Sequence, residues 1–255
     1  MIGKCIPFTS PSQSCEVHVL STEGRPLASS GPNELVSVLG ATGTALPQEL
    51  LRHLCGYEGG LPEAIRRPLV AAGATGVPAL IALVEDALAD DQTDLGWAPL
   101  HAVDLLGTIG DARAIPVLLR CLDREDELDL LVQQAAAALR ALGALALDRC
   151  LLAYATSHRD TFRDRLAGVM SRWGLHDERL YAVLLDTLQR TPELGANYLV
   201  EYGDARTLDV LAQTFDALPI REGDNPLANH VFIELRCAIE DLGGHLTAAQ
   251  QHKFA

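Results

Sequence analysis

The 255-residue sequence predicts an all-α protein built as a stack of helical hairpins, and three observations lead to this fold class. Aromatic residues make up only 5% of the chain although 48% of it is apolar, so Ala, Leu and Val must do most of the packing. Alternating runs of β-branched and aromatic residues, which are typical of strands, are almost absent beyond residue 32. Short glycine-containing turns recur at regular intervals, as they do in proteins made of repeated hairpins.

The recurring turns set the spacing of the predicted hairpins. Gly-Ala-Thr-Gly occurs at residues 40–43 and again at 73–76, and Gly-Asp-Ala-Arg occurs at 110–113 and again at 203–206. A glycine in such a turn ends a first helix, because it adopts a positive φ at little cost. The glycines expected to play this part are Gly40, Gly73, Gly110, Gly143, Gly174, Gly203 and Gly243. They predict about seven hairpins over residues 33–255.

The residues after each glycine are suited to starting a second helix. Asp111, Asp177 and Asp204 are predicted to be N-caps or near-caps of this helix, because a carboxylate there accepts a hydrogen bond from a free backbone N–H. Pro78 and Pro116 are expected in its first turn, where a missing N–H costs nothing.

Residues 97–127 form the clearest unit, and their pattern resembles a known family. The pattern is similar to the short HEAT-like repeats named after phycobilisome lyases, and residues 73–87, 134–154, 174–188 and 203–215 resemble it more loosely. The positions that carry the resemblance are Ala102, Leu106, Gly107, Ile109, Gly110, Asp111, Arg113, Ala114, Ile115, Pro116, Leu118 and Leu122. The resemblance implies a right-handed α-α superhelix, or solenoid, and it indicates the fold rather than the function.

Residues 1–32 do not fit the repeat and are predicted to form a flexible arm or a small β-hairpin. Cys5, Cys15 and His18 lie in this arm, but three candidates fall short of the four ligands of a structural zinc site, so no metal is expected. The six cysteines are scattered without a CxxC pair, which is typical of reduced thiols. Without a leader or an apolar run of 18 residues, the chain is expected to be cytoplasmic and not associated with a membrane.

Charge disfavours nucleic acid as a partner. The formal net charge is −14, whereas proteins that bind nucleic acid gain affinity from clustered basic residues. The clearest basic cluster, Arg159, Arg163, Arg165 and Arg172, is expected on a convex, solvated helix face. Two acidic stretches, residues 85–94 and 123–129, are interpreted either as solubilising loops or as a rim that attracts a basic partner.

No catalytic motif is present, and neither catalytic residues nor a cofactor are predicted. The sequence lacks GxSxG, a phosphate-binding GxxxxGK[ST] loop and HExxH. None of its eight histidines precedes a glutamate, as they do in diiron hydroxylases built from HEAT-like repeats. We therefore expect a non-catalytic module that binds a protein or peptide segment. The alternatives are a bilin-lyase-like enzyme, which the family name suggests, and a HEAT-like DNA-repair glycosylase.

The resemblance implies that second helices line the concave face and form the binding groove. Aligning them predicts one buried column, which consists of Leu80, Leu118, Cys150, Val183 and Leu211. The residues between buried columns are expected to face the partner, and several are types enriched at interface hot spots. The predicted groove residues are Arg113, Pro116, Arg120, Arg149, Tyr181, Asp186, Asp209 and Gln213.

Overall fold

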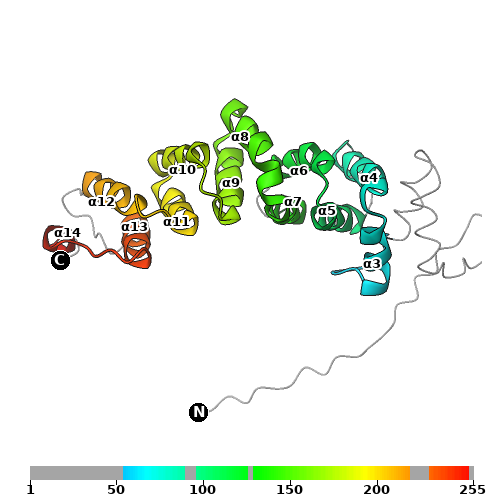
Figure 1. Cartoon of the computed structure of the whole chain (residues 1–255), viewed down its shortest axis with the longest axis horizontal. Helices are drawn as coiled ribbons and strands as arrows, with labels where there is room; N and C mark the ends of the chain where they lie inside the picture. The colour runs from blue at the N-terminus through cyan, green and yellow to red at the C-terminus, as the bar shows by residue number, and fades with distance from the viewer. Residues whose placement is uncertain (1–53, 90–95, 126–128, 219–229, 253–255) are drawn as a thin grey trace, which may run out of the picture.

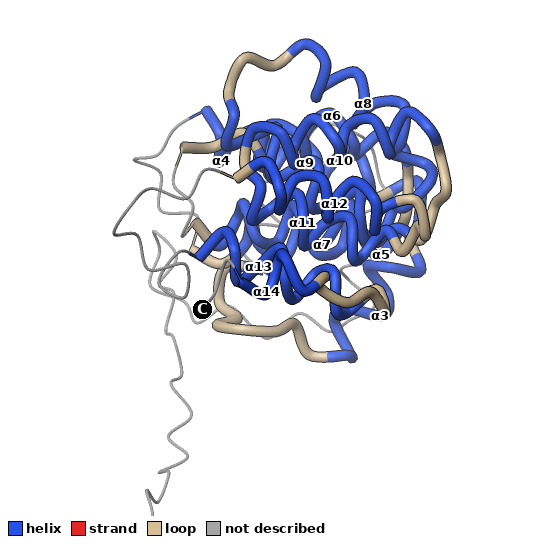
Figure 2. Tube along the Cα trace, turned by 90° about the vertical axis from the view of Figure 1, so that its left-hand side faces the viewer, coloured by secondary structure: helices blue, strands red, loops and turns tan. Residues whose placement is uncertain are grey.

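A computed structural model describes residues 54–89, 96–125, 129–218 and 230–252 of the chain. Within these ranges the regular structure is helical and contains no strand (Figure 2), so the predicted all-α class is confirmed. The expected N-terminal arm, its candidate metal ligands and the turn at Gly40 lie outside the described residues.

The helices form two rows that lie one above the other in Figure 1. The lower row contains α3 (Glu63–Ala71), α5 (Ala98–Ile109), α7 (Leu130–Leu142), α9 (Asp160–Met170), α11 (Pro192–Tyr202) and α13 (His230–Asp241). The upper row contains α4 (Val77–Ala89), α6 (Ile115–Leu122), α8 (Leu147–Thr156), α10 (Glu178–Arg190) and α12 (Thr207–Ala217), and α14 (Ala248–His252) ends the described chain. Successive helices pack against each other within each row, as α5 does on α7 and α6 on α8.

The two rows bend, and the bend runs opposite to the one implied by the resemblance. Figure 1 shows α8 and α9 raised relative to both ends, so the first helices lie on the inner side and the second helices on the outer side. Small residues explain why the first helices are closely spaced. A Cβ added to Gly107 in α5 would lie 2.7 Å from the Cα of Ala138 in α7. The first helices can lie closer to one another than the second helices, so their row forms the inner side of the bend.

The turns between the helices of a pair follow the sequence prediction. Six of the seven predicted glycines are described, and all six have positive φ: Gly73, Gly110, Gly143, Gly174, Gly203 and Gly243. Gly110, at φ 75°, ends α5 and donates its N–H to the Leu106 carbonyl at 3.2 Å. Pro78 and Pro116 lie in the first turns of α4 and α6, as expected.

Of the three predicted capping aspartates, Asp177 is the N-cap of α10, whereas Asp111 caps the 3₁₀ turn before α6 and Asp204 lies three residues before α12, so both are near-caps. The carboxylates of Asp111, Asp177 and Asp204 each accept the backbone N–H two residues further on, at 2.8–2.9 Å. The residue that supplies this N–H is an arginine in all three turns, namely Arg113, Arg179 or Arg206. Its guanidinium also donates a hydrogen bond to the carboxylate. These hydrogen bonds hold the pKa of each carboxyl at about 2, below the usual 3.8.

This lowered pKa predicts how stability depends on acid. A carboxyl whose folded-state pKa is lowered stabilises the protein fully above its unfolded pKa, and the contribution disappears as the pH falls toward the folded pKa. We expect the urea midpoint to decrease between pH 4 and pH 2, partly because of these three carboxyls. A triple variant, Asp111→Asn, Asp177→Asn and Asp204→Asn, should show a smaller decrease over the same range, as measured by circular dichroism. An equal decrease would contradict this assignment.

The core is continuous along the described stack, and the predicted buried column is part of it. Leu80, Leu118, Cys150, Val183 and Leu211 are all buried. Burial raises the pKa of the Cys121 and Cys150 thiols to about 12, so both remain protonated and unreactive at neutral pH.

One stretch of the described chain, Leu130–Thr156, is long and apolar enough to span a membrane, with a mean hydropathy of 1.5. It is not one continuous α-helix, because Gly143 at φ 55° separates α7 from α8 through a 3₁₀ turn. Its apolar residues include core side chains such as Leu131, Leu139 and Cys150. Packing between neighbouring helices therefore explains much of its apolar character.

Candidate functional site

Two of the predicted groove arginines form contacts between neighbouring hairpins. Arg113 bonds to Asp111 and also donates to the Ala74 carbonyl of the preceding hairpin at 2.7 Å. Arg120 on α6 forms an ion pair with Glu85 on α4 at 3.2 Å. Both guanidinium groups remain exposed, so solvent screens their ion pairs, and the Arg120–Glu85 pair contributes at most about 1 kcal/mol to stability. Their directly visible role is to link adjacent hairpins.

Tyr181 does not face a partner, and this part of the predicted groove is wrong. Its side chain is only 8% exposed. Its ring stacks on Tyr202 with centroids 5.6 Å apart, and the guanidinium of Arg206 lies 4.6 Å from its centroid. Since Tyr202 belongs to α11, Tyr181 lies on the side of α10 that packs against α11.

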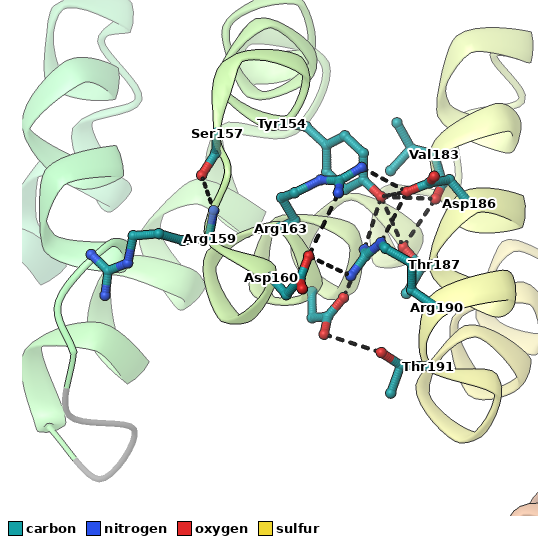
Figure 3. A network of polar contacts seen from close by, with 11 residues as sticks. Tyr154, Ser157, Arg159, Asp160, Arg163, Val183, Asp186, Thr187, Arg190 and Thr191 are labelled. Atoms are coloured by element: carbon teal, nitrogen blue, oxygen red, sulfur yellow. Dashed lines mark hydrogen bonds and ion pairs between the residues drawn. The ribbon is translucent and has the colours of Figure 1, made fainter.

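Asp186 was also expected in the groove, but it belongs to a polar network between α8, α9 and α10 (Figure 3). Its carboxylate accepts hydrogen bonds from the Tyr154 hydroxyl, from Arg163 at 2.8 Å and from Arg190 at 3.1 Å. Desolvation acts to raise the pKa of Asp186, but the hydrogen bonds from Tyr154 and Arg190 outweigh it and the pKa is lowered. The carboxylate therefore stays ionised, and its Oδ2 accepts all three hydrogen bonds, although the side chain remains 42% exposed.

Arg190 is the centre of this network. Its guanidinium forms ion pairs with Asp164 at 2.9 Å and Asp160 at 3.4 Å, and it donates to the Tyr154 hydroxyl at 3.1 Å. Arg163, expected on a solvated convex face, instead lies 4.5 Å from the centroid of the Tyr154 ring. Burial and the hydrogen bond to Asp186 raise the pKa of Tyr154, so its phenol stays neutral. The network joins the three helices α8, α9 and α10.

The other arginines of the predicted basic cluster are also used within the protein. Arg159 forms an ion pair with Asp123 at 3.0 Å, and Arg172 forms one with Glu201 at 2.6 Å. Arg165 donates to the carbonyls of Leu122 and Arg124, at 2.9 and 2.6 Å, at the C-terminal end of α6. The cluster therefore offers little uncompensated positive charge to a nucleic acid.

The remaining predicted groove residues are exposed. They are Pro116, Arg149, Asp209 and Gln213. Within the described part of the chain, Arg149 has no hydrogen bond or ion pair, and Leu152, one turn further along α8, is 54% exposed. Of the eight predicted residues, Tyr181 is covered and Asp186 is bound within the network, whereas the other six are exposed and two of them, Arg113 and Arg120, also bond to neighbouring hairpins.

A hollow of ≈ 380 Å³ lies instead on the row of first helices. It is located at the N-terminal ends of α3, α5 and α7, together with the segment that precedes α3. We call it the first-helix groove. Its lining residues are Gly59, Gly60, Leu61, Arg66, Trp97, Leu100, His101, Asp104, Leu130, Gln133 and Gln134.

The groove combines apolar side chains with amides. Trp97, Leu100 and Asp104 are spaced so that they share one face of α5. Leu130, at the start of α7, is 52% exposed although it is a large apolar residue. Gln133 is exposed, and its side chain forms no hydrogen bond with any described residue. Apolar anchors beside free amides are typical of surfaces that bind peptides or small molecules.

The groove's carboxylate and imidazole are already engaged. Asp104 accepts from Arg66 at 3.4 Å and from Gln134 at 3.3 Å. His101 is 4% exposed, and its Nε2 lies 2.8 Å from the Tyr57 carbonyl oxygen. Because a carbonyl only accepts hydrogen bonds, this nitrogen carries the proton. The arrangement holds these side chains in place and is better suited to binding than to general acid–base chemistry.

Sequence reasoning missed this groove because it looked only at second helices. A signal was available in Leu130, which falls outside the spacing of the buried α7 residues Leu131, Val132, Ala135 and Ala138. No family model matches the chain, and no curated protein matches it either, so its function is argued from these residues alone.

Proposed function

We propose that this chain is a cytoplasmic, non-catalytic HEAT-like solenoid that binds a protein or peptide segment in the first-helix groove. The recurring turn supports the repeat assignment, because the same Asp-x-Arg arrangement follows Gly110, Gly174 and Gly203 at or just before the start of the second helix. The observation that carries the proposed function is the groove itself, in which Trp97, Leu100 and Leu130 lie beside the amide of Gln133.

The dimensions of the groove suit a short segment. It crosses three neighbouring helices, and packed helices lie about 8–10 Å apart, so its length is about 20 Å. Along α5 it extends from Trp97 to Asp104, which is about 10 Å at 1.5 Å per residue. The length of about 20 Å across the three helices accommodates about six residues of extended chain. The side chain of Gln133, which bonds to no described residue, is available to bond to the backbone of such a segment.

The groove supports binding over the two enzymatic alternatives. A bilin-lyase-like enzyme would need an acidic group inside an apolar pocket; Asp104, the one carboxylate that lines this hollow, is held by Arg66 and Gln134, and Glu58 and Glu63 lie outside its lining. A HEAT-like glycosylase would need free basic groups, but the predicted basic cluster is engaged in internal ion pairs and hydrogen bonds.

The proposal is tested by replacing one exposed leucine in the groove. We expect Leu130→Ser to weaken capture of a partner from the native host about tenfold, because a leucine buried at an interface contributes about 1.5 kcal/mol. Capture is quantified by mass spectrometry on the immobilised full-length chain.

Leu152→Ser is the matched control, since Leu152 is equally exposed but lies on α8 in the other row. It should leave capture unchanged. Loss of capture with Leu152→Ser alone would place the partner on the second-helix row near Arg149. If neither variant has an effect, the first-helix groove is not the binding surface.

A further inference from the structure

We infer that the segment bound in the first-helix groove is basic, with one apolar anchor residue flanked by arginine or lysine. This inference rests on the proposed function and specifies the chemistry of its partner. The anchor contacts Trp97, Leu100 and Leu130, and the flanking cations face the carboxylates around the groove.

The described rim of the groove carries uncompensated negative charge. Glu58 and Glu63 lie just outside the lining, close in sequence to its segment 59–61; both are exposed, and neither has an ion-pair partner among the described residues. The one arginine that lines the groove, Arg66, is already bound to Asp104 and to Thr108, at 3.4 and 2.7 Å. A cationic ligand would therefore meet free carboxylates, whereas an anionic ligand would compete with Asp104 for Arg66.

The sequence adds acidic residues directly before the two helices that supply the apolar anchors. Residues 85–96, which precede Trp97, contain five acidic residues and no basic one. Residues 123–129, which precede Leu130, contain five acidic residues and one arginine. Four of these ten carboxylates are compensated, because Arg120 pairs with Glu85, Arg159 with Asp123 and Glu125, and Arg124 with Asp129. Most of the other carboxylates in these stretches add to the net charge of −14, which attracts a basic segment over long range.

Helix dipoles do not reverse this preference. The N-termini of α3, α5 and α7 meet at the groove, and each contributes a partial charge of about +0.5. The three partial charges together amount to about +1.5, which is less than the two negative charges of Glu58 and Glu63. The indole of Trp97 adds a further attraction, because tryptophan is the aromatic side chain that binds cations most strongly over its face.

The test is a selection from a random library of displayed 12-residue peptides on the immobilised full-length chain. We expect the enriched peptides to carry net positive charge and a large apolar residue. Their enrichment should fall at least tenfold on Leu130→Ser and stay unchanged on Leu152→Ser. One enriched peptide is then synthesised with a fluorescent label and titrated by anisotropy.

The titration tests the charge directly. The double variant Glu58→Gln, Glu63→Gln should raise the Kd of this peptide about threefold to tenfold, and raising NaCl from 50 to 300 mM should weaken binding to the unmodified chain. Acidic or neutral peptides that still depend on Leu130 would overturn the inference and leave the proposed function standing. Enrichment that is independent of Leu130, or none at all, would overturn both.

Discussion

Gly195→Ala should destabilise the protein by about 3 kcal/mol or more, although alanine is the better helix former. Gly195 lies inside α11, and a Cβ built there would overlap the backbone Cα and N of Leu188 on α10. Backbone atoms cannot move aside as a flexible side chain can, so α10 and α11 would have to separate. Overpacking of this kind costs about 1–3 kcal/mol and sometimes more, which exceeds the gain of about 1 kcal/mol in helix propensity. Urea denaturation followed by circular dichroism measures the change.

Gly168→Ala in α9 provides the control. The nearest atoms to an added Cβ there belong to the ring of Tyr198, at 2.8 Å, and this side chain can shift. We expect a cost below about 1 kcal/mol, because the propensity gain offsets part of the displacement. If Gly195→Ala instead stabilises the protein, α10 and α11 do not approach as closely as described.

Arg190→Met should destabilise the protein by about 2–3 kcal/mol. The substitution keeps the volume of the side-chain stem but removes the charge that Asp160, Asp164 and Asp186 share. Asp164 is most affected, because its side chain is only 16% exposed and Arg190 is its ion-pair partner. Leaving such a carboxylate unpaired costs most of its desolvation energy. The free energy of unfolding from urea titration is the measurement.

Arg120→Met is the corresponding change in an exposed ion pair. Arg120 and Glu85 are each about half exposed, and such pairs contribute at most about 1 kcal/mol. We expect a change in unfolding free energy below that value. Equal effects of the two substitutions would mean that the network around Arg190 has no special role in holding α8, α9 and α10 together.

The features that the sequence predicted correctly are governed by short-range interactions. Gly110, Asp111 and Pro116 lie within seven consecutive residues, and their geometry depends on local backbone preferences. The buried column through Leu118 and Cys150 follows from helical periodicity alone. Helix class, turn positions and caps could therefore be read from the chain before any contact between hairpins was known.

The site could not be predicted in the same way, because it depends on how hairpins sit against each other. Tyr181 is covered by Arg206, a residue in the next hairpin, and Asp186 pairs with Arg163 of the helix before it. The direction of the bend depends on close approaches such as that of Gly107 to Ala138. An alignment of second helices contains none of this information, so it predicts a partner surface on the second-helix row and does not reveal the first-helix groove.

The hydrogen bonds from Arg165 to the carbonyls at the end of α6 affect how the stack comes apart. The helix α6 has only eight residues, and a helix of that length does not persist alone in water. Its last turn is held from α9, which belongs not to the adjacent hairpin but to the one beyond it. Simple repeat arrays couple only nearest neighbours and can lose one unit at a time. Here the hydrogen bonds of Arg165 connect the hairpin α5–α6 to the hairpin α9–α10, across the hairpin α7–α8 between them. We therefore expect these three hairpins to unfold together.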